Sequence, residues 1–393
     1  MNGYPPGQQA SGAAAFMKAA FPVTHSRFTI DDSRMTPFRV FKYASPLLLY
    51  AGSLRAFLGT GLVVWLPLLY SFVLVPLLEL ALRPDARNLS AAEAELARRN
   101  PLYDWLLYLV VPMQWGALAL FLHQVAFVPA PATDLAGRTA VMGLLCGSFG
   151  INVGHELGHR SRKGERALAL TLLLTSLYMH FYIEHNKGHH KRVATPEDPS
   201  SARYGEALYP FWVRSVAGSL RSAWHIAAAE ARKAGAPGFS RRNALLVFLL
   251  MEAMLLLLVA AVFGALALGL FAVAALMGIL LLETVNYIEH YGLQRRPAPG
   301  GRYERAQPAH SWNSSHVIGR VMLFELSRHS DHHYLASRKY QELRHHEEAP
   351  QLPTGYPGMM LLALVPPAWF YVMNPRAKKI AGTPVPATSE GSI

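Results

Sequence analysis

Hydrophobic residues are gathered into long blocks along this chain of 393 residues, and polar stretches separate the blocks. The first block covers residues 38–82, and Gly59 and Gly61 interrupt it near its middle. One membrane crossing needs about 20 apolar residues, so this block is long enough for a hairpin of two helices. Blocks at 103–127 and about 139–154 predict a third and a fourth crossing.

The remaining apolar residues complete the predicted membrane part. Residues 244–286 form a second block of double length, with a turn expected near Phe263 and Gly264. The stretches 167–179 and 358–372 are too short to cross, so we expect them to lie at the interface, to dip into it or to pack on the protein. The pattern predicts an all-α integral membrane protein with six transmembrane helices.

Positively charged residues indicate how these helices are oriented. With six crossings, both ends of the chain lie on one side of the membrane, together with the segments 83–100 and 160–242 and the residues after His290. Loops rich in Lys and Arg stay in the cytoplasm. We therefore expect both termini and a helical, histidine-rich cap in the cytoplasm. The basic residues on that side include Arg39, Lys42, Arg83, Arg87, Arg98, Arg99, Arg160, Arg162 and Lys163, whereas the opposite turns carry little beyond Arg55 and Arg138.

Composition narrows the function classes. The chain carries 37 Lys and Arg residues against 25 Asp and Glu residues, which gives a net charge of +12. The basic residues flank apolar blocks and no nucleic-acid motif accompanies them, so membrane lipid rather than nucleic acid is the expected partner of this charge. The single cysteine, Cys146, excludes a disulfide framework and a Cys₄ iron–sulfur site. Any electrons that the protein uses must come from another protein or from a domain outside this chain.

The histidines of the chain, 17 in number, are concentrated in four places. These are HELGH at 155–159, HNKGHH at 185–190, His290 at the end of the sixth predicted helix, and HSDHH at 329–333. The predicted topology brings all four to the cytoplasmic side. They supply nine candidate metal ligands: His155, His159, His185, His189, His190, His290, His329, His332 and His333.

The spacing of these histidines has a physical reason. Positions three or four apart are neighbours on one face of a helix. His155 and His159 can therefore bind one metal ion, as can His185 and His189, and the segment 329–333 offers the same spacing. A second histidine directly after such a pair points about 100° further round the helix, so that one cluster can reach two ions. Nine imidazoles exceed the roughly four to six ligands of one first-row ion, and we expect two ions.

Two other interpretations of the histidines are weaker. HExxH is also a zinc-protease signature, with Glu156 as its general base. A zinc protease uses three protein ligands, so six histidines would have no role. A metal transporter would need polar residues along its membrane helices, and the predicted spans have almost none. Imidazole suits zinc, copper, iron and nickel alike, so the spacing does not identify the metal.

Carboxylates stand beside the candidate ligands. Ligating histidines commonly donate their second ring N–H to a carboxylate, which fixes the tautomer. Glu156, Glu184, Glu289 and Asp331 each adjoin a candidate ligand, and Asp198 lies in a turn from which it can reach one. We predict that these carboxylates support the ligands rather than bind the metal, because the histidines already suffice.

Small residues form a stripe along the fourth predicted helix, at Gly143, Gly147, Gly150 and Gly154. Such stripes usually let helices pack closely. A stripe leading toward His155 would also leave room for a narrow alkyl chain. We expect packing to be its main role.

The sequence around the histidines resembles the membrane-bound alkane monooxygenases, bacterial enzymes of the histidine-rich membrane desaturase and hydroxylase superfamily. The resemblance covers about residues 38–375. Its most specific element is NYIEHYGL at 286–293, because desaturases share only the looser histidine motifs. The other matching stretches are residues 155–160, 184–190, 194–199, 328–333 and 354–358.

The resemblance implies a non-haem di-iron centre that activates O₂ for the terminal hydroxylation of medium-chain n-alkanes to primary alcohols. It also implies a multi-pass protein of the bacterial inner membrane, with rubredoxin as electron donor, either as a separate protein or as a fused domain. A related fatty-acyl desaturase or aryl-methyl hydroxylase is the alternative. An acidic carrier is expected to dock on basic residues near the clusters, namely Lys187, Lys191, Arg192, Arg328, Arg338, Lys339 and Arg344.

The domain organisation expected from these observations is simple. Residues 1–36 form a polar N-terminal tail, and residues 37–375 form the membrane di-iron monooxygenase domain. Residues 376–393 form a polar tail or linker.

Overall fold

The computed structural model describes residues 39–381 of the chain, and the predicted N-terminal tail lies outside this part. The chain divides into two units, Met1–Arg39 and Val40–Ile393, and the architecture below is that of the second unit. Its described residues are mostly helical. The sheet among them is a hairpin of two short antiparallel strands, β1 (Pro297–Ala298) and β2 (Arg302–Tyr303). The expected all-α class holds apart from this hairpin.

The first apolar block folds as the predicted helical hairpin. Gly61 has a φ of 61° at the reversal, a left-handed conformation that favours glycine. Its N–H donates to Asp134 Oδ1 at 3.1 Å, which ties the turn to the start of the fourth predicted helix. The helices of this block are η1 (Lys42–Ala44), α3 (Leu47–Leu58), α4 (Leu62–Leu69), the π-helical turn η2 (Tyr70–Leu74) and α5 (Val75–Ala81).

The central helices follow. The predicted third crossing, 103–127, corresponds closely to α7 (Leu102–Phe127). The fourth is a continuous helical rod with a π-helical turn in its middle, and its last part carries the first histidine motif. The elements of this region are α6 (Ala91–Arg99), α7, α8 (Ala132–Leu145), the π-helical η3 (Cys146–Ile151) and α9 (Asn152–Gly158).

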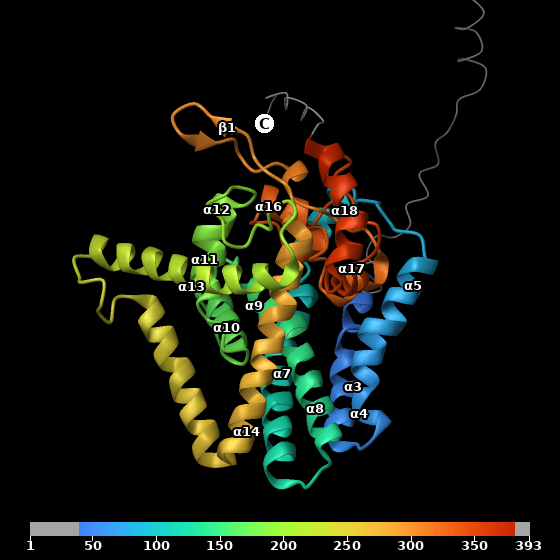
Figure 1. Cartoon of the computed structure of the whole chain (residues 1–393), viewed down its shortest axis with the longest axis vertical. Coiled ribbons are helices and arrows are strands. Elements are labelled where there is room, and N and C mark those ends of the chain that lie inside the picture. The colour runs from blue at the N-terminus through green and yellow to red at the C-terminus, as the bar shows by residue number, and fades with distance from the viewer. Residues whose placement is uncertain (1–38, 382–393) are drawn as a thin grey trace, which may run out of the picture. The chain divides into compact units, whose positions relative to one another are not determined.

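The segment between the fourth rod and the second long block is folded into shorter helices. Figure 1 shows α13 crossing one end of the upright helices, near α11 and α12. The elements are α10 (Lys163–Leu174), α11 (Phe181–Glu184), the π-helical η4 (His185–His189), α12 (His190–Arg192) and α13 (Leu208–Lys233).

The second long block forms α14 (Ala244–His290), an element of 47 residues. A straight helix of that length would be about 70 Å long, more than twice the roughly 30 Å of a membrane hydrocarbon core. The backbone breaks at Gly264, with φ 81° and ψ 176°, so α14 consists of two arms (Figure 1). The predicted turn near Gly264 is confirmed.

The C-terminal part is compact and carries the last histidine motif. Bulky aromatic residues, among them Trp312 and Trp369, form its core with Tyr287 of α14 and Tyr291, which directly follows α14. The final helix continues beyond Pro375, where a polar tail was expected to begin, and Ala377 is buried in the same core. The elements are η5 (Pro308–His310), α15 (Val317–Met322), α16 (His329–Tyr334), η6 (Tyr340–Glu342), α17 (Tyr356–Ala363) and α18 (Pro366–Ala381).

Length and composition identify fewer membrane helices than the six expected. Three described helices are long and apolar enough to cross a membrane, and a fourth candidate is the bent pair Tyr356–Ala363 and Pro366–Ile380, with an angle of 119°. Two causes contribute to the difference. The two arms of α14 count as one element, and α3 has only 12 residues. The three long helices are Leu62–Ala81, Leu102–Phe127 and Ala244–His290.

The predicted stripe of small residues packs helices together. A Cβ added at Gly143 would lie 2.7 Å from Met277 Cβ, and one at Gly147 would lie 3.1 Å from the carbonyl oxygen of Gly278, both on α14. Gly150 and Gly154 face the segment of α10 and the turn that follows it. Close approach of backbones is the usual role of such residues between membrane helices, and this expectation is confirmed.

Candidate metal centre

Nine histidines converge at one end of the bundle, from segments far apart in the sequence. They come from α9 and the residue after it, from η4 and α12, from the last residue of α14 and from α16. Their ring nitrogens form two groups, in each of which all ligand atoms lie within 4.8 Å of one another. The five-histidine group consists of His155, His159, His185, His190 and His332, and the four-histidine group of His189, His290, His329 and His333.

The five-histidine group turns its Nε2 atoms inward. His155 Nε2 lies 2.9 Å from His332 Nε2, and His159 Nε2 lies 3.0 Å from His185 Nε2. His190 Nε2 lies 3.0 Å from the same atom of His185 and 3.1 Å from that of His332. The five nitrogens therefore surround one small volume.

The four-histidine group has the same construction. His189 Nε2 lies 3.2 Å from His333 Nε2, which in turn lies 2.8 Å from His329 Nε2. The distance from His329 Nε2 to His290 Nε2 is 3.3 Å. All four rings are buried.

These distances fit bound metal ions. Imidazole nitrogens bind such ions at roughly 2.1 Å, so two of them lie about 3.0 Å apart at a right angle and about 3.4 Å apart at the tetrahedral angle. The observed separations run from 2.8 to 3.3 Å. A hydrogen bond between two imidazoles uses one proton, and a nitrogen with several such neighbours cannot satisfy all of them. Lone pairs that converge on a cation can.

Electrostatics favour the form of histidine that binds metal. Burial lowers the pKa of most of these rings, and neighbouring histidines lower it further because each would repel another imidazolium. The rings are therefore neutral, with a lone pair available for an ion. Among the nine candidate ligands, the histidines outside the membrane-spanning helices with a lowered pKa are His159, His185, His190, His329, His332 and His333.

The π-helical turn η4 determines which histidines of the motif at 185–190 enter which group. The sequence predicted that His185 and His189, four residues apart, would share one ion. In the wider turn of η4, His185 instead faces His190, five residues on, and His189 enters the other group. His155 and His159 do fall in one group, as their α-helical spacing predicted.

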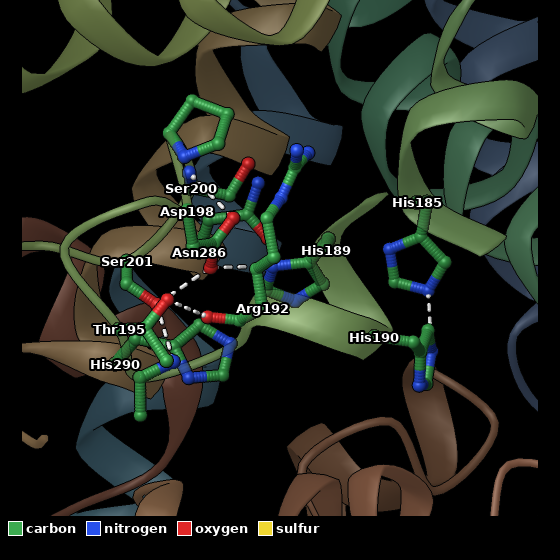
Figure 2. A network of polar contacts seen from close by, with 12 residues as sticks. His185, His189, His190, Arg192, Thr195, Asp198, Ser200, Ser201, Asn286 and His290 are labelled. Atoms are coloured by element: carbon green, nitrogen blue, oxygen red, sulfur yellow. Dashed lines mark hydrogen bonds and ion pairs between the residues drawn. The ribbon is translucent and has the colours of Figure 1, made fainter. Parts of the chain in front are cut away.

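Asp198 supports His189 in the manner expected from the sequence (Figure 2). Its Oδ2 accepts hydrogen bonds from His189 Nδ1 at 2.9 Å and from the Ser201 hydroxyl at 2.6 Å, and its Oδ1 accepts from the Ser200 N–H at 3.1 Å. Burial lowers the pKa of His189, but the adjacent carboxylate outweighs burial and raises it. The proton is thereby held on Nδ1, and the Nε2 lone pair points into the four-histidine group.

Two other predicted carboxylates contact no ligand ring. Glu156 accepts from Arg160 Nη2 at 2.7 Å and from the Tyr340 N–H at 3.1 Å, so it ties α9 to η6. Glu184 accepts from Arg192 Nη2 at 2.6 Å and from a backbone N–H of η4 at 3.2 Å. Both hold the ligand-bearing segments in place through backbone and arginine contacts.

Asp331 serves a similar purpose in α16. It accepts from Arg338 and from the Arg344 N–H, the latter at 2.9 Å, and its Oδ1 lies 2.7 Å from His346 Nε2. The carboxylate thus anchors the loop after α16 and contacts no ligand ring.

Glu289 lies closer to the centre than the sequence suggested. Its side chain is 1% exposed, and its Oε2 lies 3.1 Å from His329 Nε2. The Tyr356 hydroxyl donates to Oε1 at 2.7 Å. Sequence reasoning did not select Tyr356, Ser200 or Ser201, although Tyr356 lies in one of the stretches that carry the resemblance.

An apolar cavity is lined by residues that neighbour the histidine motifs in sequence, and none of its lining residues is a histidine. It has a volume of about 60 Å³, and its lining includes Asn152, one helical turn before His155, and Leu326, three residues before His329. A larger apolar pocket of about 500 Å³ lies beside it, bordered by α4, α13, α14 and α17. Both are lined by Phe72, Leu281 and Met360, so the two spaces share a wall.

Comparison with known proteins agrees with this site. The sequence model of the family described as fatty acid desaturase matches residues 129–363, which include all nine histidines. The chain is 38% identical to an alkane 1-monooxygenase of Acinetobacter baylyi, covering 77% of this chain and 74% of the relative. It is 39% identical to alkane 1-monooxygenase 1 of Alcanivorax borkumensis, covering 79% of this chain and 77% of the relative.

A relative whose name indicates a different activity is less similar. The hydroxylase component of the xylene/toluene monooxygenase of Pseudomonas putida is 30% identical, covering 84% of this chain and 86% of the relative. Family match, sequence identity and the two histidine groups agree with one another. The chain belongs to the fatty acid desaturase family and, within it, to the membrane-bound alkane monooxygenases.

Proposed function

We propose that this chain is an alkane 1-monooxygenase that converts a medium-chain n-alkane, O₂, two electrons and two protons into a primary alcohol and water. The observation that carries the proposal is the pair of histidine groups, together with an apolar cavity lined by residues of α9 and α14, two of the helices that supply the ligands. The alkane 1-monooxygenases among its relatives support the same substrate class.

The metal is proposed to be iron, with one ion in each histidine group. Neutral imidazoles suit iron, and membership of this family supports it over zinc or copper. When bound, the two irons would activate O₂, so that one of its oxygen atoms enters a C–H bond and the other is released as water. The protein holds the ligands: Asp198 fixes the tautomer of His189, and Glu156, Glu184 and Asp331 brace the segments that carry the others.

Alkane is proposed to reach the centre from the membrane through the two apolar spaces. An alkane has no polar group for hydrogen bonding, so the shape of its pocket must select the terminal methyl group. The larger pocket would admit the chain beside α4 and α14, and the smaller cavity would hold the methyl group next to the histidines. Phe72, Leu281 and Met360 stand where the two spaces meet.

The membrane arrangement is proposed to have six crossings, with the histidine groups on the cytoplasmic side of the inner membrane. Two arms of α14, the hairpin of α3 with α4–α5, α7, and the rod from α8 to α9 would supply them. A reporter fused after Pro375 should then read cytoplasmic, and one inserted at Pro131 periplasmic. A periplasmic C-terminus would contradict the arrangement.

Rubredoxin is proposed as the electron donor, because the chain has a single cysteine and cannot build an iron–sulfur centre. The docking residues expected from the sequence need correction. Arg328 is 3% exposed and donates to backbone carbonyl oxygens of Arg87 and Leu343, so it cannot meet a carrier. Lys339 lies 2.6 Å from Asp104, and Arg338 pairs with Asp331. With these charges neutralised, we expect a weaker dependence of turnover on ionic strength than the basic sequence implies.

The decisive experiment is turnover by the purified protein, loaded with iron, in lipid bilayers. With reduced rubredoxin, an n-alkane and ¹⁸O₂, the product should be the 1-alkanol carrying one labelled oxygen, identified by mass spectrometry. His155→Ala should lose metal and activity together. An alkene as product, or oxidation of aryl methyl groups only, would favour the alternative members of the superfamily.

A further inference from the structure

A pocket with positively charged residues in its lining lies at the same end of the molecule as the histidine groups. It has a volume of about 480 Å³, and the segment that follows α14, together with η5 and α18, forms most of its lining. Figure 1 shows β1 and the end of α18, which border the pocket, at the end of the molecule opposite the turn between α7 and α8. The proposed membrane arrangement places this end in the cytoplasm. We call the space the basic pocket, after its lining residues Arg295, Arg296 and Lys378.

The wall of the basic pocket is directly connected to a ligand of the four-histidine group. Gly292 and Leu293 line the pocket and follow His290 by two and three residues. From the other side, His310 lines the pocket, and the hydroxyl oxygen of the next residue, Ser311, lies 3.5 Å from His290 Nδ1. One residue therefore connects this part of the surface to a ligand ring.

The positive charges of the basic pocket are not neutralised by the fold. Arg295 is 8% exposed, and its guanidinium group donates to two backbone carbonyl oxygens at 2.7 and 3.0 Å. Among the described residues, no ion pair joins a carboxylate to Arg295, Arg296 or Lys378. The one carboxylate in the lining, Glu304, accepts from the Arg296 N–H at 2.8 Å and lies 3.2 Å from His310 Nε2. Because a buried cation without a carboxylate is costly, the pocket favours an anionic partner.

The basic pocket has properties that the docking residues expected from the sequence lack. Arg328 is buried, and Lys339 is paired with Asp104. Arg296 and Lys378, by contrast, are exposed at the rim of the pocket. Apolar and aromatic side chains that include Tyr204 and Ile380 complete the lining, and a mixture of such side chains with arginine is typical of the central part of a protein–protein contact.

We propose that the electron donor of this enzyme docks over the basic pocket with an acidic surface, and that this position brings the donor close to the ligand His290. The inference rests on the proposed function, which requires two external electrons for each O₂. A carrier that gives up one electron is itself oxidised by one, so two reduced carriers dock in succession for each alkane that is hydroxylated. The two protons come from water.

Binding of oxidised rubredoxin to the iron-loaded enzyme in phosphatidylcholine nanodiscs tests the proposal without turnover. The double variant Arg296→Glu with Lys378→Glu reverses two charges at the pocket, and neither side chain contacts a candidate metal ligand. At low ionic strength its Kd for rubredoxin, measured by calorimetry, should rise at least about tenfold, because like charges that face each other across an interface oppose binding. Its iron content should equal that of the parent.

The double variant Arg162→Glu with Lys163→Glu is the matched control. Both residues are exposed near the start of α10, do not line the basic pocket and give the same change in net charge. This variant should bind rubredoxin as the parent does. The neutral variant Arg296→Gln with Lys378→Gln should show a smaller rise in Kd than the charge reversal, and it provides the test if the reversed protein does not fold.

Three results would overturn the proposal. The first is the parent's Kd in both pocket variants, and the second is an equal rise in Kd in the control, which would show that net charge rather than this pocket matters. The third is unchanged rubredoxin binding together with weaker binding to phosphatidylglycerol vesicles, which would assign the pocket to lipid.

A separate measurement tests the proposed function. Enzyme reduced with dithionite and then exposed to O₂ and an n-alkane needs no carrier, so the parent and the pocket variants should form equal amounts of 1-alkanol. A parent that forms none would overturn the proposed function, whereas the binding results would still decide where the carrier docks.

Discussion

Replacing Asp198 by Asn tests how the protein controls one ligand. The carboxylate accepts from three donors, His189 Nδ1–H, the Ser201 hydroxyl and the Ser200 N–H. An amide of the same shape has only one oxygen. In one orientation its NH₂ group faces the Ser200 N–H, and in the other it faces His189 Nδ1 and Ser201. Either way at least one buried donor meets another donor, or His189 must move its proton to the nitrogen that should bind metal.

The size of the effect follows from these contacts. Loss of the partner behind a metal-bound histidine typically weakens metal binding about 10- to 100-fold, or about 1.4 to 2.7 kcal/mol. A hydrogen bond to a charged group contributes about 1.5 to 3 kcal/mol, which is the same range. Only the four-histidine group should be affected, since Asp198 contacts no ring of the five-histidine group.

Competition with a chelator measures the change. Increasing concentrations of chelator are applied to the iron-loaded protein, and the remaining iron is counted by mass spectrometry. Asp198→Asn should release one ion at about 10- to 100-fold lower chelator concentration and the other as in the parent. Glu283→Gln is the control, because Glu283 is a buried glutamate of α14 that accepts from the hydroxyls of Tyr178 and Ser215 and contacts no ligand ring. Equal release curves for Asp198→Asn and the parent would refute the reasoning.

Three further outcomes are expected. Met360→Trp places a larger side chain between the two apolar spaces and should narrow the passage for the alkane. The value of kcat/KM should therefore fall more for long alkanes than for short ones. An unchanged dependence of kcat/KM on alkane length would contradict the proposed route. Gly278→Ala would place a Cβ 2.5 Å from Cys146 Cβ and should lower stability by about 1–3 kcal/mol in thermal unfolding, whereas Gly269→Ala, with nothing within 4 Å, should not. The metal-free protein should unfold more easily as pH falls below about 6.5, because the unfolded chain then binds protons on histidines, such as His332, whose pKa the fold lowers. A flat pH profile of the unfolding temperature would contradict this.

Features of the fold that depend on residues close together in the sequence could be predicted from the sequence. The helix expected at 103–127 corresponds to Leu102–Phe127, because a long apolar run has few alternatives to a helix in a membrane. The break near Gly264 was also predicted, since an apolar block of double length must turn and glycine adopts the required φ. The convergence of the histidines followed from placing four motifs on one side of the bundle.

Features that depend on distant contacts were not predicted. Lys339 meets Asp104 across the fold, and Arg338 meets Asp331, so residues that were expected to offer free charges to a carrier are paired. The position of Glu289 relative to His329 depends on how α14 and α16 pack against each other, which periodicity does not determine. The sequence therefore identified residues that lie near the histidine groups, but it did not predict which of them are buried or paired with an opposite charge.

The π-helical turn of η4 has a consequence for how this protein can change. His189 and His190 are consecutive, yet they enter different groups, because the wider turn contains one residue more than an α-helix would. Gly188 lies at its centre, where Glu184 and Arg192 come so close that a Cβ would overlap both. Deleting a single residue between His185 and His189 would rotate the following histidines by about 100° and misdirect ligands of both groups at once. Insertions and deletions in this segment should therefore be far more damaging than exchanges of exposed residues that keep its length.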